Sequence, residues 1–520
     1  MNLATLAEAA ADRLGERTTL IFEDAPVTNF ETLDLARRAQ TAFATLGVKR
    51  GEIVAMCMIS HPLVYSVFQG IFRCGATAVP VMFMLTAPEL RFVLEDTRAQ
   101  GIVTDAANLA KVLQACDGLE HVRWIAVNDG ADDMHSTPRQ YSLQTLLQSP
   151  PTSTLPQIGD DDTALMLYTS GTTGKPKGVM LTHANLITGA DAAADASELH
   201  SRTQPRISMS AMPMAHIFGV GVMLGSYLAP ERLADSRVVQ LQWFDTLKFM
   251  RGIQHYRCNS MAAVPSMLSM ILNHPDVDSY DLSSLDEVVC GAAPLPTELA
   301  QTFMRRYDCR VREIYGMTEN AGMATANRPS DRYRPGSAGR PYKGVELKIF
   351  DLDDKEVAVG ERGEVVTRGP CTMKGYHNRP DATAEALRGG WLHTGDIGYV
   401  DSDGFLFLVD RKKDMIIKGG ENIYPAELED VLYRHPKVAE AAIVGVPDTV
   451  HGESVVAFVV VKAAEQLSES EVLQFMAGTV SKFKLPQRVY FRDALPKVGV
   501  GKILRRELRA EAISRIQQQD

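Results

Sequence analysis

The segment from Leu165 to Leu186 constrains this chain most, because an apolar run breaks there into ten small, hydroxylated and basic residues before apolar residues resume. Glycines let a backbone come close to an anion, hydroxyl groups donate hydrogen bonds to its oxygens, and lysines supply positive charge. The residues that offer these groups are Thr169, Ser170, Gly171, Thr172, Thr173, Gly174, Lys175, Lys177 and Gly178. We therefore predict a phosphate-binding loop whose ligand is a nucleoside triphosphate.

Two alternatives compete with this interpretation. A stretch rich in glycine, serine, threonine and lysine is also typical of a flexible surface loop. The Walker A pattern, GxxxxGK followed by serine or threonine, does not occur in this segment. A P-loop nucleotidase is therefore disfavoured.

Length and composition describe a large soluble protein. The chain has 520 residues, too many for one ordinary domain, so we expect at least two. Hydrophobic residues make up 45% and charged residues 23%, as in an ordinary globular protein. The net charge of -10 argues against nucleic acid as the main partner, although an acidic protein can still bind anions locally.

The seven cysteines are scattered, odd in number and without CxxC spacing, which indicates buried thiols in a reducing compartment and no zinc site. They are Cys57, Cys74, Cys116, Cys258, Cys290, Cys309 and Cys371. The N-terminus lacks the basic start and apolar core of a secretion signal, and no run of about 18 uninterrupted apolar residues occurs. The last residues are not a peroxisomal signal. We expect a soluble, cytoplasmic protein.

Up to about Asn327 the chain alternates between helical and strand-like patterns, which predicts parallel βα units. Thr28 and Glu31 form a capping box at the start of a helix that stops at Gly47. The next expected elements are a strand at 53–59, a helix at 62–75, a strand at 77–81, a helix from 88 and a strand at 101–104. Residues 131–160, rich in Pro, Ser, Thr and Asp, indicate a surface connection.

The pattern changes twice after that. Short apolar alternations between Gly336 and Asp410 predict β-hairpins that form a distorted barrel or a sheet. After Asp410, strands and helices predict a compact α+β unit with a capping box at Ser468 and Glu471. The expected α/β fold thus has an N-terminal domain, residues 1–410, of parallel-rich subdomains plus a small β-barrel-like subdomain. A smaller C-terminal domain would span residues 411–520.

Two short motifs follow strand-like segments and offer groups that fit a nucleotide. Gly291, Ala292, Ala293 and Pro294 are small, so a flat base could lie against this backbone, although a strand that ends in a turn gives the same pattern. The second motif offers an aromatic face for stacking, a hydroxyl for a phosphate and a carboxylate for Mg²⁺. It consists of Tyr315, Gly316, Met317, Thr318 and Glu319.

Four later features have both a plain and a functional interpretation. Asp396 could accept both hydroxyls of a ribose, but its Thr-Gly-Asp sequence is also common in plain turns. The charged run from Arg411 to Asp414 is either a solvated surface or a hinge between the two domains. Gly419 and Gly420 either let a narrow substrate pass or form a simple turn. Lys502 precedes a basic helix, so a solvated tail is the alternative to a functional lysine.

Residues 168–178 read YTSGTTGKPKG and match the signature of the AMP-forming acyl-adenylating enzymes over eleven consecutive positions. With the other motifs in this order, essentially the full chain closely resembles the AMP-forming acyl-CoA synthetase family, which also contains luciferases and peptide-synthetase adenylation domains. The resemblance implies two steps: a carboxylate and Mg-ATP give an acyl adenylate and pyrophosphate, and a thiol, most often that of coenzyme A, then displaces AMP. It implies ATP, Mg²⁺ and coenzyme A as cofactors.

The resemblance also implies a role for each motif on the nucleotide side. The loop from Thr169 to Lys177 would hold the β- and γ-phosphates, and residues 291–294 with Tyr315 would hold the adenine. Thr318 would contact the α-phosphate, Glu319 would bind Mg²⁺, and Asp396 and Arg411 would bind the ribose.

In the C-terminal part, the resemblance implies that Lys502 stabilises charge between the carboxylate and the α-phosphate as the bond forms. Lys413 would be the hinge about which the domain turns after adenylation. That rotation would remove Lys502 and bring Gly419 and Gly420 to the pantetheine channel.

The acyl side is less closely specified. His216 corresponds to a family residue that gates or lines the acyl channel, and the segments 214–220 and 321–323 are apolar and mostly small. Glu313 and Ile314 stand where many relatives carry Gln-Gly, and malonate-activating members have an arginine at the position of Ile314. A second carboxylate would lack a partner, so we expect a hydrophobic monocarboxylic acid. A medium- or long-chain fatty acid is the first choice, and an aryl or cyclic acid such as a cinnamate or benzoate is the second.

Three further alternatives stay open. Acyl-AMP ligases that load a carrier protein commonly have an insertion before the hinge, which residues 336–410 lack. A luciferase-like oxygenase usually ends in a peroxisomal tail, which is missing here. A non-catalytic nucleotide- or acyl-binding protein would be expected to have lost Lys502 or Glu319, and both are present. Peripheral contact with a membrane and a homodimer are both compatible with the sequence.

Overall fold

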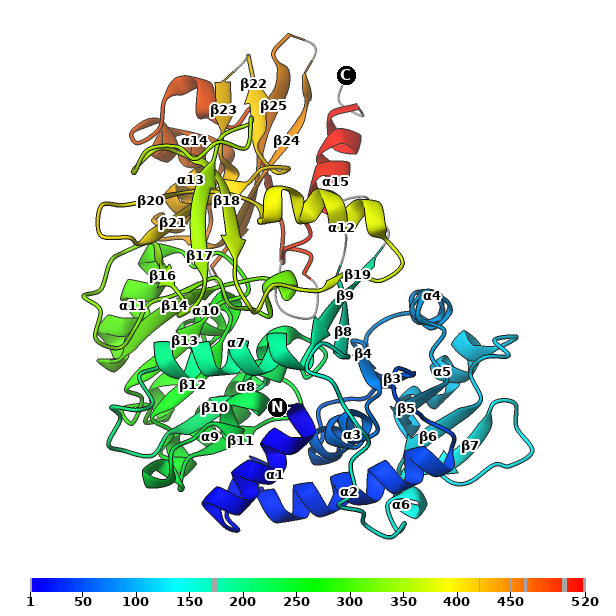
Figure 1. Cartoon of the computed structure of the whole chain (residues 1–520). Coiled ribbons are helices and arrows are strands. Elements are labelled where there is room, and N and C mark those ends of the chain that lie inside the picture. Colours follow the sequence, from blue (N-terminus) through cyan, green and yellow to red (C-terminus); the bar gives the residue numbers. More distant parts are fainter. Residues whose placement is uncertain are drawn as a thin grey trace.

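A computed structural model gives the architecture of the chain (Figure 1). It describes residues 2–169, 176–419, 421–448, 450–462, 465–497 and 503–517. Several expected site residues lie outside this part of the chain, namely Ser170, Gly171, Thr172, Thr173, Gly174, Lys175, Gly420 and Lys502.

The N-terminal part contains an eight-stranded sheet with the order β19-β9-β8-β4-β3-β5-β6-β7. Its strands are β3 (Ile53–Cys57), β4 (Thr77–Pro80), β5 (Gly101–Asp105), β6 (Trp124–Asn128), β7 (Arg139–Ser142), β8 (Thr163–Thr169), β9 (Lys177–Thr182) and β19 (Gly375–Tyr376). The strands from β3 to β8 pair in parallel, whereas β9 is antiparallel to both β8 and β19. The connecting helices are α2 (Asn29–Thr45), α3 (Pro62–Arg73), α4 (Ala87–Thr97) and α5 (Leu109–Cys116).

A thirteen-stranded sheet joins a parallel half to an antiparallel half. The parallel strands are β1 (Thr18–Phe22), β10 (Ile207–Ser210), β11 (Arg237–Gln240), β12 (Ser260–Ala263), β13 (Glu287–Cys290) and β14 (Arg310–Tyr315), with β2 (Ala25–Thr28) antiparallel at the edge. The antiparallel strands are β15 (Thr325–Ala326), β16 (Ser337–Pro341), β17 (Glu346–Phe350), β18 (Gly363–Arg368), β20 (Leu392–Val400) and β21 (Leu406–Arg411). The helices between residues 183 and 386 are α7 (His183–Ala196), α8 (Ile217–Tyr227), α9 (Thr246–Tyr256), α10 (Pro265–Leu272), α11 (Thr297–Tyr307) and α12 (Pro380–Ala386). The strands predicted as hairpins after Gly336 thus pair in the linear order β17-β18-β20-β21-β16 and extend the large sheet.

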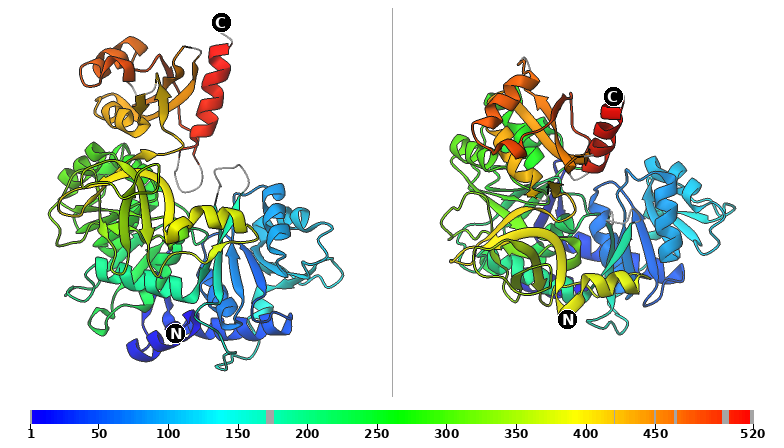
Figure 2. Two further views of the ribbon diagram at one scale, coloured as in Figure 1. Left: turned by 45° about the horizontal axis from the view of Figure 1, so that its top comes forward. Right: turned by 90° about the horizontal axis from the view of Figure 1, so that it is seen from above.

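The C-terminal part has a sheet of its own and forms a separate lobe at one end of the molecule (Figure 2). Its strands are β22 (Ile416–Lys418), β23 (Glu421–Ile423), β24 (Val438–Asp448), β25 (Gly452–Val461) and β26 (Arg488–Phe491). Its helices are α13 (Pro425–Tyr433), α14 (Glu469–Ala477) and α15 (Arg505–Gln517). The mixed α/β fold with a smaller C-terminal domain is therefore confirmed.

Local sequence signals located many of the ends correctly. Thr28 and Ser468 accept the predicted hydrogen bonds from the backbone N–H groups of Glu31 and Glu471. The surface connection predicted at 131–160 is wrong in part, because β7 and the short helix α6 (Leu143–Leu146) lie within it. Strand β7 pairs with β6, and this pairing outweighs the turn-rich composition.

All seven cysteines are free and buried. In the part of the chain with described coordinates, no helix has the length and apolar content that crossing a membrane requires.

A buried histidine attaches the first helix, α1 (Leu3–Leu14), to the start of α7. The backbone N–H of Leu3 donates a hydrogen bond of 3.2 Å to Nδ1 of His183, and Phe72 packs edge-on against the same ring. Burial lowers the pKa of His183 to about 4. A proton on Nδ1 would remove the acceptor of the Leu3 hydrogen bond, and the charged ring would be buried away from water. This contact therefore requires the neutral ring.

We predict that the His183 contact weakens in mild acid. The unfolded chain takes up a proton near the ordinary histidine pKa of about 6.5, whereas the folded chain does so only near 4. The free energy of unfolding should therefore decrease as the pH is lowered through this window, by about 2 kcal/mol from pH 7.5 to pH 5. A His183→Gln variant keeps an acceptor but cannot be protonated, so it should lack this part of the loss. Urea titrations at both pH values measure the difference, with the exposed His255→Gln as control. Equal pH dependence in wild type and His183→Gln would contradict the prediction.

Candidate active site

The two ends of the predicted phosphate loop are held together by strand pairing. Thr169 ends β8 and Lys177 begins β9, and these two residues face each other in the antiparallel register. Beside the loop, the hydroxyl of Tyr168 donates a hydrogen bond of 2.7 Å to Asp96 at the end of α4. The other carboxylate oxygen of Asp96 accepts a bond of 2.9 Å from Arg379. The strands on either side of the predicted loop therefore form a fixed hairpin.

The second side of β9 brings in a tyrosine and a carboxylate. Tyr376 pairs with Val179 through β19, and the ammonium of Lys177 lies 4.9 Å from the centre of the Tyr376 ring. The Tyr376 hydroxyl donates a hydrogen bond of 2.9 Å to Oε1 of Glu319, which is only 6% exposed. Burial and the neighbouring Glu319 carboxylate raise the pKa of Tyr376 well above its usual range. Lys177, at the end of the predicted phosphate loop, and the predicted Mg²⁺ ligand thus contact the same tyrosine.

The motif that contains Glu319 is a tightly folded turn at the end of β14. Residues Thr318–Asn320 form a short 3₁₀ helix, and the side chain of Asn320 accepts a bond of 2.9 Å from the N–H of Met317. At Gly316 the backbone approaches Gly322 so closely that a Cβ atom would lie 2.1 Å from the Gly322 carbonyl oxygen. Only glycine fits there. This close approach fixes the direction in which Thr318 and Glu319 leave the strand.

The predicted base-binding segment lies next to this turn. Residues 291–294 follow β13, which pairs in parallel with β14, so both segments leave the same edge of the sheet. A Cβ on Gly291 would come within 2.7 Å of the Ile314 side chain, and Ala292 has a φ of 69°. The small residues from Gly291 to Pro294 therefore form a turn packed against the residue before Tyr315.

Three of the predicted nucleotide residues contact one another directly. The hydroxyl of Tyr315 donates a hydrogen bond of 2.6 Å to Oδ2 of Asp396, and Arg411 Nε lies 2.9 Å from Oδ1 of the same carboxylate. Asp396 and Arg411 are opposite each other in the pairing of β20 with β21. Asp396 raises the pKa of Arg411, and burial together with Asp396 raises the pKa of Tyr315. The aromatic face and the carboxylate are therefore fixed side by side.

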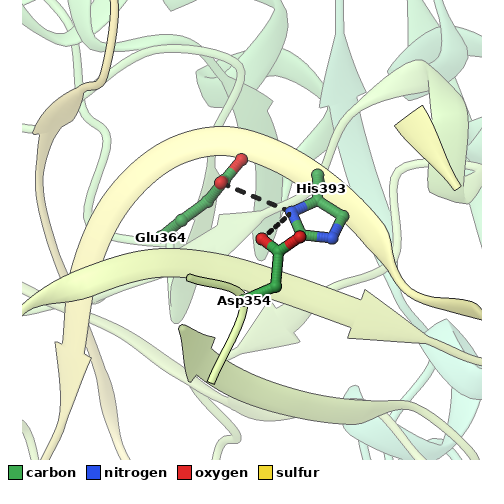
Figure 3. Close-up of side chains that lie close together, drawn as sticks. All are labelled: Asp354, Glu364 and His393. Atoms are coloured by element: carbon green, nitrogen blue, oxygen red, sulfur yellow. Dashed lines mark ion pairs between the residues drawn. The ribbon is translucent and has the colours of Figure 1, made fainter. Parts of the chain in front are cut away.

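An ion-pair network around the buried Glu364 supports the turn that carries Asp396, and Figure 3 shows Glu364 with its neighbours Asp354 and His393. Glu364 accepts a bond of 3.1 Å from the N–H of Gly395 and lies 3.4 Å from Nδ1 of His393. Its Oε2 is 3.2 Å from the ammonium of Lys412. Asp354, Glu364 and His393 are close enough together to hold a metal ion. However, Arg388 forms bonds of 2.8 and 2.9 Å with Asp354, so Arg388 and Lys412 already balance the two carboxylates. We interpret the cluster as structural.

His216 lies at the start of α8. It caps this helix, and its Nδ1 accepts a bond of 3.2 Å from the N–H of Phe218. The helix is apolar along most of its length and packs between the cores of the two large sheets.

The C-terminal motifs lie beyond β21. Lys413 is exposed in the turn between β21 and β22. Gly419 follows β22 in the turn to β23, with a φ of 60°. Of the chain around Lys502, the described residues Lys497 and Ile503 pair as an isolated bridge. The predicted site residues thus belong to both lobes.

Sequence reasoning missed Tyr376, Asp96 and Glu364. Tyr376 meets Glu319 only because β19 pairs with β9, and that pairing joins segments almost two hundred residues apart. Asp96 lies in the last turn of α4 and Glu364 near the start of β18, and neither residue belongs to a recognisable motif. Local spacing contains no signal for such contacts.

Comparisons with known proteins agree with this geometry. The model of the AMP-binding enzyme family matches residues 7–377, and that of the AMP-binding enzyme C-terminal domain matches residues 427–502. A feruloyl-CoA synthase of Amycolatopsis sp. is 37% identical over 91% of each chain. A long-chain-fatty-acid–CoA ligase of Bacillus subtilis (strain 168) is 31% identical over 98% of this chain and 94% of its own.

Similarity extends to solved structures. The crystal structure of an anthranilate CoA ligase in complex with anthranoyl-AMP superposes with a TM-score of 0.90 at 27% identity, and covers 99% of this chain and 98% of the ligase.

We predict that Tyr376→Phe lowers kcat/KM for Mg-ATP about tenfold, because a hydrogen bond to a carboxylate is worth about 1.5–3 kcal/mol and this bond orients Glu319. Pyrophosphate release measured across ATP and Mg²⁺ concentrations tests this, and KM for the acid should change little. Tyr399→Phe, in a stacked pair with Phe407 on β20, is the matched control. Unchanged kinetics in Tyr376→Phe would show that the bond does not matter for nucleotide use.

Proposed function

Because this chain belongs to the AMP-binding enzyme family, as an AMP-forming acyl-CoA synthetase that uses ATP, Mg²⁺ and coenzyme A, we propose that the acid it activates is a hydrophobic monocarboxylic acid. A medium- or long-chain fatty acid is the favoured substrate. The observation that carries the proposal is a largely apolar cavity beside α8.

The nucleotide would be held by groups that the fold brings to one edge of the two large sheets. The loop closed by Thr169 and Lys177 would bind the β- and γ-phosphates, and Thr318 the α-phosphate. Adenine would stack on Tyr315 against residues 291–294. Asp396 would accept the ribose hydroxyls beside Arg411, since a carboxylate accepts several hydrogen bonds at once.

Glu319 fits the role of Mg²⁺ ligand. It is a buried carboxylate, oxygen is the ligand atom that Mg²⁺ prefers, and no lysine or arginine among the described residues forms an ion pair with it. Tyr376 bonds to Oε1 of Glu319, and no described residue donates a hydrogen bond to Oε2. Bound there with the triphosphate, Mg²⁺ would neutralise charge on the phosphate oxygens.

Activation of the acid requires the two lobes to cooperate. A carboxylate is a poor electrophile, and AMP is a stabilised leaving group, so the adenylate makes thioester formation feasible. Lys502 would stabilise the charge that develops while the acyl–AMP bond forms. Rotation about Lys413 would then remove Lys502 and bring the turn at Gly419 and Gly420 towards the pantetheine channel.

The lining of the cavity beside α8 is an argument for a long apolar acyl chain. Side chains from α1, α2, α3 and α8 line it, among them Ala7, Leu14, Leu33, Tyr65, Val222 and Ser226. Val222 is one helical turn beyond Phe218, on the same face, and His216 begins the helix. From Phe218 to Ser226 the helix rises by about 12 Å. An acyl chain that enters beside His216 could follow α8 into the cavity.

An aryl or cyclic acid is the second candidate, and the similarity to feruloyl-CoA synthase favours it. Dicarboxylic acids are disfavoured because Ile314, packed against Gly291, offers no charge to a second carboxylate. The length of the accepted chain separates the two candidates, since each buried methylene contributes about 0.8 kcal/mol.

We predict that Lys502→Ala lowers adenylate formation by about 10² to 10³ fold, the usual loss when one preorganised group is removed from developing charge. Thioester formation from supplied acyl adenylate should change far less, because Lys502 acts only in the first step. Pyrophosphate release and single-turnover thioester formation measure the two steps separately. An equal loss in both would rule out this role.

We also predict that filling the cavity shortens the acid that the enzyme accepts. Ser226→Leu should lower kcat/KM at least tenfold for acids of ten or more carbons, because two or three methylenes lose their place at about 0.8 kcal/mol each. Acids of four to six carbons should be unaffected. Ser226→Ala is the control, since it removes only a hydroxyl that bonds to the Met223 carbonyl.

The wild-type enzyme should prefer octanoate or 4-coumarate to acetate and malonate in the same assays. Higher kcat/KM for malonate or acetate than for both hydrophobic acids would refute the proposed substrate class. A rise in kcat/KM from four to ten carbons would select the fatty acid, and a flat profile with high 4-coumarate activity would select the aryl acid.

A further inference from the structure

Helix α13 of the C-terminal lobe begins without a capping side chain of its own. Its N-cap residue, Tyr424, makes no side-chain capping bond, and Pro425 at the first position has no N–H. The next N–H, that of Ala426, donates a hydrogen bond of 2.8 Å to Oδ2 of Asp410. A carboxylate from the end of β21 therefore caps the helix.

This bond crosses the proposed hinge. Asp410 belongs to β21 in the large sheet, and its other oxygen accepts a bond of 2.7 Å from the N–H of Arg411. Ala426 belongs to the C-terminal lobe, and Lys413 lies between the two in the chain. Rotation of the lobe about Lys413 would separate Asp410 from α13.

Charged groups around the bond tie it to the segment of Lys502. Arg505, at the start of α15, forms bonds of 2.7 and 2.6 Å with Glu429 of α13, and its other terminal nitrogen is 4.0 Å from Asp414. Burial raises the pKa of Asp410 to about 7, against the opposing effects of the Ala426 N–H and of Arg505. Asp410 is thus partly buried between the large sheet and the docked lobe.

The orientation of the lobe fits the first step of the reaction. In Figure 1 the hairpin of β22 and β23, whose turn holds Gly419, lies at the end of the lobe away from the large sheets. The start of α15, which follows Lys502 in the chain, lies at the nearer end. A second contact holds the same arrangement, as Arg362 lies 5.4 Å from the ring centre of Tyr424.

We propose that Asp410 is a positioning residue that holds the C-terminal lobe in the adenylating orientation by capping α13, and that this bond breaks before the thiol step. The inference rests on the hinge rotation proposed above and on no particular acid.

The test compares Asp410→Ala with Asp410→Asn in the full-length enzyme, using an acid that wild type activates. Alanine removes the acceptor, so adenylate formation should fall about fivefold, as expected when a helix loses its cap. Thioester formation from supplied acyl adenylate should stay at or above the wild-type rate. Asparagine keeps an acceptor oxygen and should restore most of the first step. Asp430→Ala, which removes an exposed partner of Arg434 within α13, should change neither step.

Limited trypsin digestion adds a readout that is independent of activity. Lys412 and Lys413 are exposed beside the bond, so cleavage there should be faster in Asp410→Ala than in wild type or Asp410→Asn. Equal losses in both half-reactions, or an Asp410→Ala enzyme that matches wild type in both assays, would overturn the proposal.

Lys413→Pro separates this proposal from the one on which it rests. Proline fixes φ near −65° and restricts the hinge, so it should slow the thiol step and spare adenylation. Normal coenzyme A turnover in Lys413→Pro would overturn the rotation and the role of Asp410 together. A thiol-step defect in Lys413→Pro without any effect of Asp410→Ala would overturn the role of Asp410 alone.

Discussion

Strand β9 is hydrogen-bonded on both sides, to β8 and to β19, and the geometry of the site depends on this double pairing. On one side it closes the phosphate loop at Thr169 and Lys177. On the other side it brings Tyr376 to Glu319 from β19, a segment that follows β18 of the second large sheet in the chain. Because backbone hydrogen bonds fix the register on both sides, the described ends of the loop, Thr169 and Lys177, keep a fixed spacing from Tyr376 and so from the Glu319 carboxylate.

An acidic protein that binds a polyanion has to arrange its cations locally. The described site achieves this with few of them: Lys177 lies over the Tyr376 ring, and Arg411 is paired with Asp396. Lys412 and Arg388 form ion pairs with Glu364 and Asp354, next to the turn that carries Asp396. Since these carboxylates neutralise the cations beside them, the positive charge for the phosphates would come from the predicted loop and from Mg²⁺, and a net charge of -10 is then compatible with nucleotide binding.

The sequence allowed prediction of what local chemistry determines. The capping boxes at Thr28 and Ser468 appear as expected, and the motifs that contain Tyr315, Asp396 and Arg411 meet in space. Contacts that depend on long-range pairing could not be predicted, such as Tyr376 with Glu319 or Asp410 with Ala426. The strand β7 was missed for the same reason, because its partner β6 and not its own composition makes it a strand.

The division of the chain separates three tasks that a single rigid site would have to combine. In the proposed function, the edges of the large sheets would hold the nucleotide, α8 with its cavity would hold the acid, and Lys502 would act from a lobe joined at one turn. A lysine that favours adenylation would occupy space that the thiol needs, so placing it beyond a hinge lets one site serve two steps. This arrangement requires that the lobe dock reversibly. A contact made by one partly buried carboxylate to one backbone N–H suits this purpose, because it orients α13 yet loses little when water replaces it.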